Sequence, residues 1–162
     1  MIDYGFTDKA GRHVTLREVD GENWRAVADV APLDDQRRYV AATAARYLLL
    51  SMREDDWNSL AVCADAAVVG HVMWGRDDDG SHWIGGMLID AAEQGKGVGR
   101  ALLRTMTGWL GAQEGCWAIR LSWHPDNVVA GRLYASLGFV PTGVVDGDEL
   151  VAELAPSPAG AH

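Results

Sequence analysis

The amino-acid sequence predicts a single α/β (α+β) domain with about seven strands and about four helices. Three observations support this fold class. Apolar runs of strand length alternate along the chain with segments of helical periodicity. The 162 residues suit one domain, and 48% hydrophobic residues are enough for one sizeable core. No internal repeat or linker divides the chain, so we expect residues 1–162 to form one domain.

The first part of the chain is predicted to supply one strand and two helices. We expect residues 1–11 to be a loose arm, and the alternation of apolar side chains then predicts a strand at His13–Val19. A short helix is predicted at Glu22–Val30 and a second helix at Asp34–Met52, with Pro32 breaking the helical pattern between them. The later, apolar turns of the second helix should cover the sheet.

The remaining strands are apolar runs bounded by turn residues. They are predicted at Ser59–Ala64, Ala67–Trp74, His82–Ile89, Trp117–Trp123, Phe139–Val145 and Glu149–Leu154. Two more helices connect these strands, one opening at the glycines of residues 95–99 and one at Asn127. The small, polar segment Pro156–His162 is expected to be a disordered tail.

A glycine-rich turn that opens an amphipathic helix is the most informative segment of the chain. Gly95, Gly97 and Gly99 follow an apolar run, and apolar residues then repeat at helical spacing. Without side chains in the way, consecutive backbone N–H groups can converge on a phosphate at the positive end of the helix dipole. One glycine would suffice for a connecting turn, so three alternating glycines beside Lys96 and Arg100 favour a ligand-binding loop.

The spacing of this loop excludes two common phosphate-binding motifs. A dinucleotide fingerprint needs a third glycine where Arg100 stands, and a P-loop needs Ser or Thr where Gly97 stands. What remains is the pattern Gln-x-x-Gly-x-Gly, formed by Gln94, Gly97 and Gly99.

A second motif lies in the predicted helix near residue 130. With Asp126 as the cap, Asn127, Ala130 and Tyr134 fall on one helical stripe. Gly138 ends the helix at a position where a left-handed residue is favourable. A lone tyrosine is more often a packing residue, but its place on the Asn127 stripe favours a functional role. The adjoining stripe should pack on the sheet and contains Val129, Leu133 and Leu137.

Together the two motifs resemble those of the GNAT superfamily, the acyl-CoA-dependent N-acyltransferases. The pattern Gln-x-x-Gly-x-Gly is similar to the pyrophosphate loop of that superfamily, and Asn127–Phe139 is similar to its motif Asn-x-x-Ala-x-x-x-Tyr-x-x-x-Gly-Phe. The resemblance implies the three-layer GNAT fold, with a mixed, mostly antiparallel central sheet of about seven strands flanked by about four helices. It also implies acetyl-CoA as co-substrate and an amine that attacks the thioester directly, without a covalent enzyme intermediate.

The resemblance further implies roles for single residues. The strand backbone at Met87, Leu88 and Ile89 would bind the pantetheine arm, and Leu88 would face the acyl carbonyl where the strands splay. Asn127 would bind the CoA arm, and the phenol of Tyr134 would protonate the departing thiolate. The pyrophosphate would be held by Gln94, Gly95, Lys96, Gly97, Val98, Gly99 and Arg100.

Between Val14 and Leu154 the chain resembles a narrower branch, the bacterial spermine/spermidine acetyltransferases, for example at Glu22–Val27. The chain departs from that branch at residues 39–45, which lack its Pro-Asn segment, and at Gly85-Gly86, where the branch has an arginine. Both departures lie near the expected acceptor side. The branch implies a polyamine acceptor and a homodimer.

Composition narrows the range of partners. A formal charge of −9 and a pI of about 4.8 argue against nucleic-acid binding and favour a cationic acceptor. No signal peptide or bilayer-spanning run is recognisable, so we expect a cytoplasmic protein without a membrane partner. Neither the histidines nor Cys63 and Cys116 show metal-ligand spacing, so no metal is expected.

A base must remove a proton from an alkylammonium acceptor before the amine can attack. We take Glu93 as the candidate base, with Asp90, His82 and Glu22 as alternatives. A negative field that attracts the acceptor could come from Asp34, Asp35, Asp55, Asp56, Asp146, Asp148 and Glu149. Candidates for cation–π contacts in an acceptor cleft are Trp24, Trp57, Trp74, Trp83 and Trp123.

The first functional prediction is therefore an N-acetyltransferase for a polyamine or a similar small cationic amine. An amine-bearing antibiotic and a protein amino group stay open as acceptors. The non-enzymatic alternative is a degenerate domain that senses acyl-CoA, which would need the glycine loop but not Tyr134.

Overall fold

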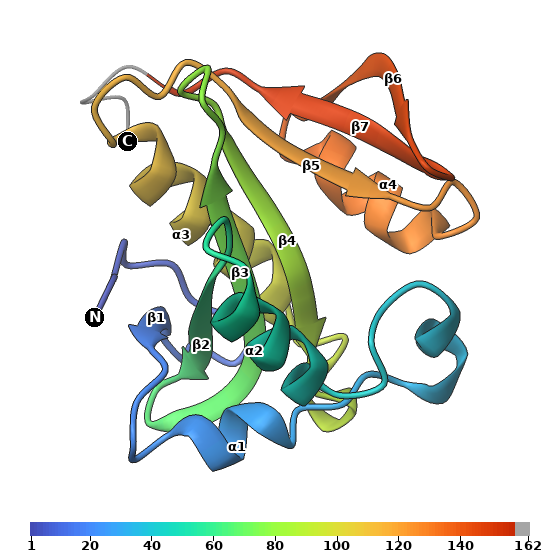
Figure 1. Ribbon diagram of the computed structural model, residues 1–162. Helices are drawn as coiled ribbons and strands as arrows, with labels where there is room; N and C mark the ends of the chain where they lie inside the picture. Colours follow the sequence, from blue (N-terminus) through green and yellow to red (C-terminus); the bar gives the residue numbers. More distant parts are fainter. Residues whose placement is uncertain (158–162) are drawn as a thin grey trace.

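The computed structural model describes residues 1–157 and shows a seven-stranded sheet with the order β1-β2-β3-β4-β5-β7-β6 (Figure 1). All neighbouring strands are antiparallel except β4 and β5, which are parallel. The mixed, mostly antiparallel sheet predicted from the sequence is confirmed. The strands are β1 (Val14–Glu18), β2 (Asn58–Ala64), β3 (Ala67–Arg76), β4 (His82–Ile89), β5 (Ile119–Trp123), β6 (Val140–Asp146) and β7 (Glu149–Leu154).

Four α-helices and two short 3₁₀ helices flank the sheet within residues 1–157. None of these helices is long and apolar enough to span a membrane. The helices are α1 (Trp24–Ala28), η1 (Asp34–Arg38), α2 (Ala44–Arg53), η2 (Ala91–Glu93), α3 (Val98–Gly111) and α4 (Val128–Ser136).

The predicted helix Asp34–Met52 is wrong in its middle, where the chain separates η1 from α2. Tertiary contacts override the local pattern there, because Ala41 is buried and its backbone N–H donates to the Tyr47 hydroxyl at 3.1 Å. The helix predicted at Glu22–Val30 is shorter than expected, since the Asp20 carboxylate accepts the backbone N–H groups of Glu22 and Asn23 in a turn before α1.

Alternating side chains of the strands divide the core between the two faces of the sheet. In β2, Leu60 and Val62 pack into the cluster that includes α3 and α4, whereas Ala61 and Cys63 pack with Val27 of α1. Helices α1 and α2 therefore cover one face of the sheet, while α3 and α4 cover the other (Figure 1). The result is the three-layer arrangement expected from the sequence.

The N-terminal arm, expected to be loose over residues 1–11, is bound to the domain. Ile2 and Leu16 exchange backbone hydrogen bonds of 2.8 and 3.0 Å, and the Phe6 carbonyl accepts the Val14 N–H at 2.9 Å. Phe6 also packs on the main core, where the guanidinium of Arg104 lies 4.0 Å from the centre of its ring. The tail predicted at Pro156–His162 lies outside the described residues from 158 onward.

Strands β4 and β5 separate soon after they meet, and this separation opens the sheet. The two parallel strands pair only at His82 with Ile119 and at Trp83 with Arg120, although β4 continues to Ile89 and β5 to Trp123. Strands β5, β7 and β6 turn away together with α4 (Figure 1). On its β5 side, the backbone of β4 beyond Trp83 thus has no neighbouring strand among the described residues, whereas its other side stays paired with β3.

Candidate active site

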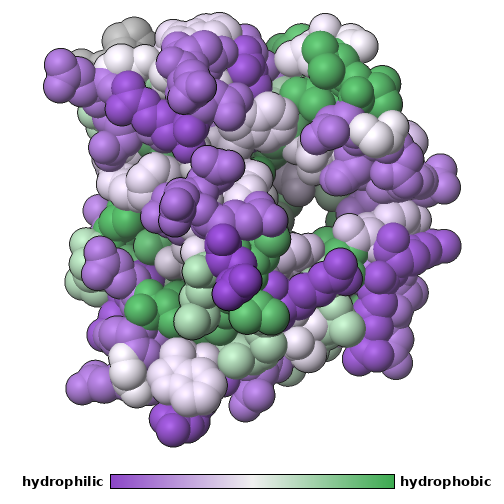
Figure 2. All heavy atoms as spheres, in the orientation of Figure 1, coloured by the Kyte–Doolittle hydropathy of each residue, from purple (hydrophilic) through white to green (hydrophobic). Residues whose placement is uncertain are grey.

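A cavity of about 240 Å³, called here the central cavity, lies where β4 and β5 diverge. Figure 2 shows the surface hollowed between the β5–β7 lobe and the segment around η1. Its walls come from β4, β5, α4, the β6–β7 turn and the segment before α2. The residues that matter for the chemistry are Tyr39, Tyr47, Trp57, Gly86, Met87, His124, Asn127, Tyr134 and Glu149.

A bulge in β4 shapes the floor of the central cavity. The pairing between β3 and β4 shifts after His71, and Gly86 takes a positive φ of 53° at this point. The His71 ring is buried and its Nδ1–H donates to the Gly86 carbonyl at 2.7 Å. Burial lowers the pKa of His71 to about 4, so the ring is neutral and its Nε2 accepts from the Ser59 hydroxyl at 2.9 Å. The buried histidine holds the bulge in place.

Close packing explains why glycines stand at residues 85 and 86, where the chain departs from the polyamine branch. A Cβ atom at Gly85 would lie 2.9 Å from the Trp57 ring, and one at Gly86 would lie 2.7 Å from Cε of Met73. Only glycine lets these side chains approach β4 so closely. The arginine of the related branch has no room at this position without a shift of Trp57.

The three strand residues predicted to bind the pantetheine arm follow the bulge. Met87 lines the central cavity, and the Leu88 side chain is buried on the α2 face among Val30 and Ala44. Ile89 ends β4, just before the turn into η2. Within residues 1–157, no strand pairs with β4 on its β5 side here, so this edge of the strand is open to a ligand except at the Ile89 carbonyl, which accepts from the Gln94 amide.

The glycine loop enters α3 without a side-chain cap. Gly95 and Gly97 have φ values of 77° and 85°, and Gly97 is the N-cap of the 14-residue helix α3. Among the described residues, 1–157, no side chain caps the first N–H groups of the helix, and a Cβ at Gly95 would meet nothing within 4 Å. An open backbone at a helix N-terminus fits a pyrophosphate, so the loop suits the group predicted for it.

The side chains of this loop are engaged with the protein. The Gln94 amide donates to Gln36 at 2.6 Å and to the Ile89 carbonyl at 3.0 Å, and Arg100 donates to the Ser136 hydroxyl at 2.8 Å. These side chains fasten the loop to η1, β4 and α4. The backbone of the loop therefore remains the part available to the cofactor, and Val98 and Gly99 belong to the first turn of α3.

Lys9 crosses the loop, and sequence reasoning missed it. Its backbone N–H donates to the Lys96 carbonyl at 2.8 Å, and its Nζ donates to the Gly95 carbonyl at 3.0 Å. The ammonium group thus lies beside the expected pyrophosphate position. No pattern in residues 1–11 indicated this contact, because it depends on the arm folding back over 86 residues of sequence.

Replacing Gly97 with valine is expected to weaken acetyl-CoA binding at least about tenfold, because a β-branched residue is strained at positive φ. The new Cβ would also lie 3.1 Å from Cγ of Lys9 and push the arm away from the loop. Isothermal titration calorimetry measures the change. Gly143→Val is the matched control, since Gly143 has a φ of 83° but open space around it, far from the loop. Unchanged affinity in a folded Gly97→Val protein would refute the loop assignment.

Tyr134 reaches the central cavity from α4. Its side chain is 9% exposed and packs against Trp123 and Phe139, and no other group within residues 1–157 forms a hydrogen bond with its hydroxyl. Burial, followed by the negative charge of Glu149, raises the pKa of Tyr134 to about 12. The phenol therefore stays protonated at neutral pH and is able to give a proton.

The structure corrects two details of the predicted α4. Asn127, not Asp126, is the N-cap, and its Oδ1 accepts the Ala130 N–H at 3.4 Å. Val129 was predicted to pack on the sheet but is 78% exposed. The inward face of α4 is formed by Ala130, Leu133 and Tyr134 instead, whereas Val128 and Val129 of the first turn are exposed.

Glu93, the predicted base, lies outside the central cavity. Its carboxylate accepts from Arg12 at 2.6 Å and from Lys96 at 3.3 Å. The hydrogen bond from Arg12 lowers the pKa of Glu93, although partial burial opposes this. The chain turns toward the N-terminal arm after β4, and this turn carries Glu93 away from Tyr134.

The alternative bases are also placed elsewhere. Asp90 caps η2 by accepting the Ala92 N–H at 3.1 Å, His82 is buried against Trp74, and Glu22 is exposed before α1. Among residues 1–157, no three His, Cys, Asp or Glu side chains are grouped so that they could hold a metal ion.

Two carboxylates, Asp146 and Glu149, line the central cavity with Tyr134, and Glu149 is the less exposed of the two. Burial raises the pKa of Glu149, and the nearby charges of Asp148 and Asp146 raise it further. The Ser122 hydroxyl donates to its Oε1 at 3.4 Å and lowers the pKa in opposition. The sequence placed Glu149 only among the acids of a negative field, because its approach to Tyr134 depends on the pairing of β7 with β5.

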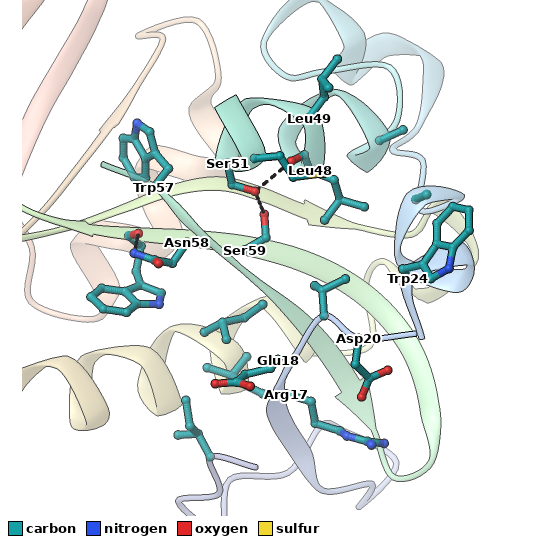
Figure 3. Close-up of a pocket in the computed structure, with 18 of the residues that line it drawn as sticks. Arg17, Glu18, Asp20, Trp24, Leu48, Leu49, Ser51, Trp57, Asn58 and Ser59 are labelled. Carbon is teal, nitrogen blue, oxygen red and sulfur yellow. Dashed lines mark hydrogen bonds between the residues drawn. The ribbon is translucent and has the colours of Figure 1, made fainter. Parts of the chain in front are cut away.

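The five candidate tryptophans divide between two cavities. Trp57, Trp83 and Trp123 line the central cavity. Trp24 and Trp74 instead line a larger cavity of about 1160 Å³ between α1, α2, the edge strand β1 and its neighbour β2. Trp57 also borders this cavity (Figure 3). A hydrogen bond of 2.7 Å between Ser51 and Ser59 joins α2 to β2 at this cavity. Neither Tyr134 nor the glycine loop borders it.

The fold and the site define a class of protein. An open sheet, a glycine loop at a helix N-terminus and a buried tyrosine at the opening fit an enzyme that binds an extended, phosphate-bearing co-substrate. The chain belongs to the Acetyltransferase (GNAT) family, whose model matches residues 14–139. The prediction of a GNAT-type acyltransferase is confirmed.

Relatives and solved structures agree with this family. The chain is 28% identical to a spermine/spermidine N(1)-acetyltransferase of Bacillus subtilis over 141 residues, which cover 82% of this chain and 91% of the relative. It resembles the GNAT domain of S. lividans PAT with a TM-score of 0.71 and 16% identity, covering 93% of this chain and 94% of the other. A spermidine N-acetyltransferase from Vibrio cholerae, solved with CoA and spermine, has a TM-score of 0.68 and 18% identity, with 88% and 95% covered.

Proposed function

We propose that this protein transfers the acetyl group of acetyl-CoA to a primary amine of a polyamine or a similar small cationic amine. The observation that carries the proposal is the pairing of Tyr134 and Glu149 in one cavity at the open side of β4. The polyamine class is supported by the name of the Bacillus subtilis relative and by the spermine held in the Vibrio cholerae structure. Solved neighbours that contain CoA support the co-substrate.

Acetyl-CoA would be bound and oriented mainly by backbone groups of the protein. The N–H groups at the start of α3 and the ammonium of Lys9 would hold the pyrophosphate. The open edge of β4 at Met87–Ile89 would align the pantetheine arm, and Asn127 would border it from α4. This alignment brings the thioester carbonyl to the mouth of the central cavity, where proximity lowers the barrier to attack.

Three proton transfers accompany the reaction. Glu149, ionised, takes a proton from the ammonium of the acceptor, directly or through water, and leaves a nucleophilic amine. The amine nitrogen forms a bond to the carbonyl carbon, the carbon–sulfur bond breaks, and Tyr134 gives its proton to the departing sulfur. The nitrogen then gives up its second proton, which restores the Tyr134 phenol directly or through water. The products are the amide, the CoA thiol and the one proton held by Glu149, so no oxidant or further reactant is needed.

Other acceptors and a non-catalytic role remain as outcomes of the test. An aminoglycoside acetyltransferase AAC(6')-Ib in complex with coenzyme A has a TM-score of 0.69 and 19% identity, covering 88% of this chain and 94% of the other. An antibiotic amine or a protein amino group would use the same cavity. A sensor of acyl-CoA would need neither Tyr134 nor Glu149 there. By resemblance we also propose that the protein is cytoplasmic and forms a homodimer. Light scattering would test the oligomeric state.

A thiol-release assay with acetyl-CoA and a panel of acceptors tests the proposal. We expect turnover with spermidine or spermine that exceeds turnover with an aminoglycoside or a lysine peptide. Turnover should fall as salt is added, because Asp146 and Asp148 are exposed carboxylates that steer cations. A much faster rate with an aminoglycoside or a peptide would contradict the polyamine as acceptor. The absence of thiol release with every amine would contradict the enzymatic function.

A further inference from the structure

A second cavity of about 610 Å³ opens beside the central cavity, and arginines surround it. Four arginines line this arginine groove, although the whole chain has 14 lysines and arginines and a net charge of −9. No Asp or Glu is among the lining residues. The arginines of the groove are Arg37, Arg38, Arg46 and Arg53, and Figure 2 shows hydrophilic side chains gathered over the segment around η1.

These positive charges are left largely uncompensated by the protein. Arg37 pairs with Asp34 at 3.3 Å, but both side chains are exposed and such a pair contributes little. Arg38 lies over the Tyr39 ring at 4.8 Å. Within residues 1–157, no carboxylate lies within 4.0 Å of the guanidinium groups of Arg46 and Arg53. In a chain with 23 acidic residues, a cavity lined by four arginines and, among the described residues, by no acid is a favourable site for an anion.

The arginine groove is anchored to the reaction site. Gln36 and Gln94 exchange two hydrogen bonds, of 2.8 and 2.6 Å, and thereby fix η1 to the glycine loop. Tyr47 stacks on the buried His71 ring at 5.6 Å, which fixes the start of α2 to the β4 bulge. The groove therefore keeps a fixed position relative to the thioester.

The two cavities adjoin each other, and their linings carry opposite charges. They share the side chains of Tyr39, Val40, Tyr47 and Leu50. Glu149 and Asp146 border the central cavity, and the four arginines border the groove. An acceptor that spans both cavities would place its amine beside the acids and its other end among guanidinium groups.

We infer that the acceptor carries an anionic group, a carboxylate or a phosphate, in addition to its primary amine. The inference rests on the proposed acetyl transfer to a small amine, and within that class it favours an amine with an anionic group over a simple polyamine. Guanidinium groups bind both anions with paired, charge-assisted hydrogen bonds. The second ammonium of a simple polyamine would instead face like charges. The groove also lies at residues 39–45, where this chain departs from the polyamine branch.

Matched acceptor pairs that differ by one anionic group test this inference with acetyl-CoA and the full chain. Ornithine is putrescine with an added carboxylate, lysine is cadaverine with an added carboxylate, and phosphoethanolamine is ethanolamine with an added phosphate. We expect kcat/KM for the anionic member of a pair to exceed that of its partner by about 10- to 100-fold. The pair with the larger ratio distinguishes carboxylate from phosphate.

Variants of the groove locate the effect. Arg46→Gln combined with Arg53→Gln should raise KM for the anionic acceptor about tenfold or more, with little change in kcat, and should leave putrescine and ethanolamine unaffected or improved. Arg25→Gln is the control, because Arg25 is exposed on α1 and lies over Trp24, outside the groove. Thermal unfolding confirms that the variants fold.

The possible failures are distinguishable. Acetylation of putrescine or spermidine at rates equal to or above those of the anionic partners, unchanged by the arginine variants, would overturn the inference and leave the acetyltransferase function intact. Absence of acetylation of every amine would overturn the proposed function itself. A lysine peptide that outcompetes all small acceptors and is insensitive to the arginine variants would also overturn the inference.

Discussion

Replacing Tyr134 with phenylalanine is expected to lower kcat by about 10²–10⁴-fold, the usual contribution of general acid catalysis. The change removes the hydroxyl and keeps the ring that packs against Trp123 and Phe139. Because the phenol forms no hydrogen bond with other groups of residues 1–157, its loss leaves no buried partner unpaired. Acetyl-CoA affinity and stability should therefore change little. Steady-state kinetics with saturating acceptor, together with calorimetry, separate the two effects.

Tyr39→Phe is the matched control for this variant. Tyr39 also lines the central cavity, but it lies on the side of His124 and the arginine groove, so losing its hydroxyl should leave kcat nearly unchanged. If Tyr134→Phe keeps a near wild-type kcat while chemistry limits the rate, Tyr134 is a packing residue and water supplies the proton.

Replacing Glu149 with glutamine is expected to lower kcat/KM by about 10²–10⁴-fold as the base is lost. The wild-type enzyme should gain activity as the pH rises through the pKa of Glu149, because only the ionised carboxylate accepts a proton. Burial and the charges of Asp148 and Asp146 raise that pKa. The rise of activity with pH, called here the acid limb of the pH profile, should therefore occur at a higher pH than for an ordinary glutamate. In Glu149→Gln this limb should disappear from the pH profile of kcat/KM.

Two neighbouring substitutions should move the acid limb in opposite directions. Asp148→Asn removes a negative charge that raises the pKa of Glu149, so the limb shifts to lower pH. Ser122→Ala removes a hydrogen bond that lowers this pKa, so the limb shifts to higher pH. A limb that stays in place in both variants would show that another group is the base. Glu93→Gln tests the group predicted from the sequence and should leave the limb unmoved.

The glycine loop and the tyrosine helix were predictable because their signals are local. Alternating glycines at 95, 97 and 99 indicate a loop with backbone conformations that other residues rarely adopt. Gly95 and Gly97 indeed have positive φ. The stripe of Asn127 and Tyr134 follows from helical spacing alone, and the structure places both residues at the central cavity. The seven strands likewise followed from apolar runs and turn residues within the sequence itself.

The rest of the site depends on contacts between distant segments. Glu149 reaches Tyr134 because β7 pairs with β5, and Lys9 reaches the glycine loop because the N-terminal arm pairs with β1. The arginine groove forms only because the chain leaves its helix after η1, where Ala41 becomes buried. Local periodicity predicted a continuous helix there, which would distribute the same arginines along a single helix and would not form the groove.

A crystal structure of the protein with bound CoA would test the central claim most directly. We expect the pyrophosphate against the backbone of residues 95–99, the pantetheine arm along β4 at Met87–Ile89, and the sulfur within hydrogen-bonding distance of the Tyr134 hydroxyl. A CoA molecule bound elsewhere, for example in the larger cavity beside Trp24, or a sulfur remote from both Tyr134 and Glu149, would contradict the account.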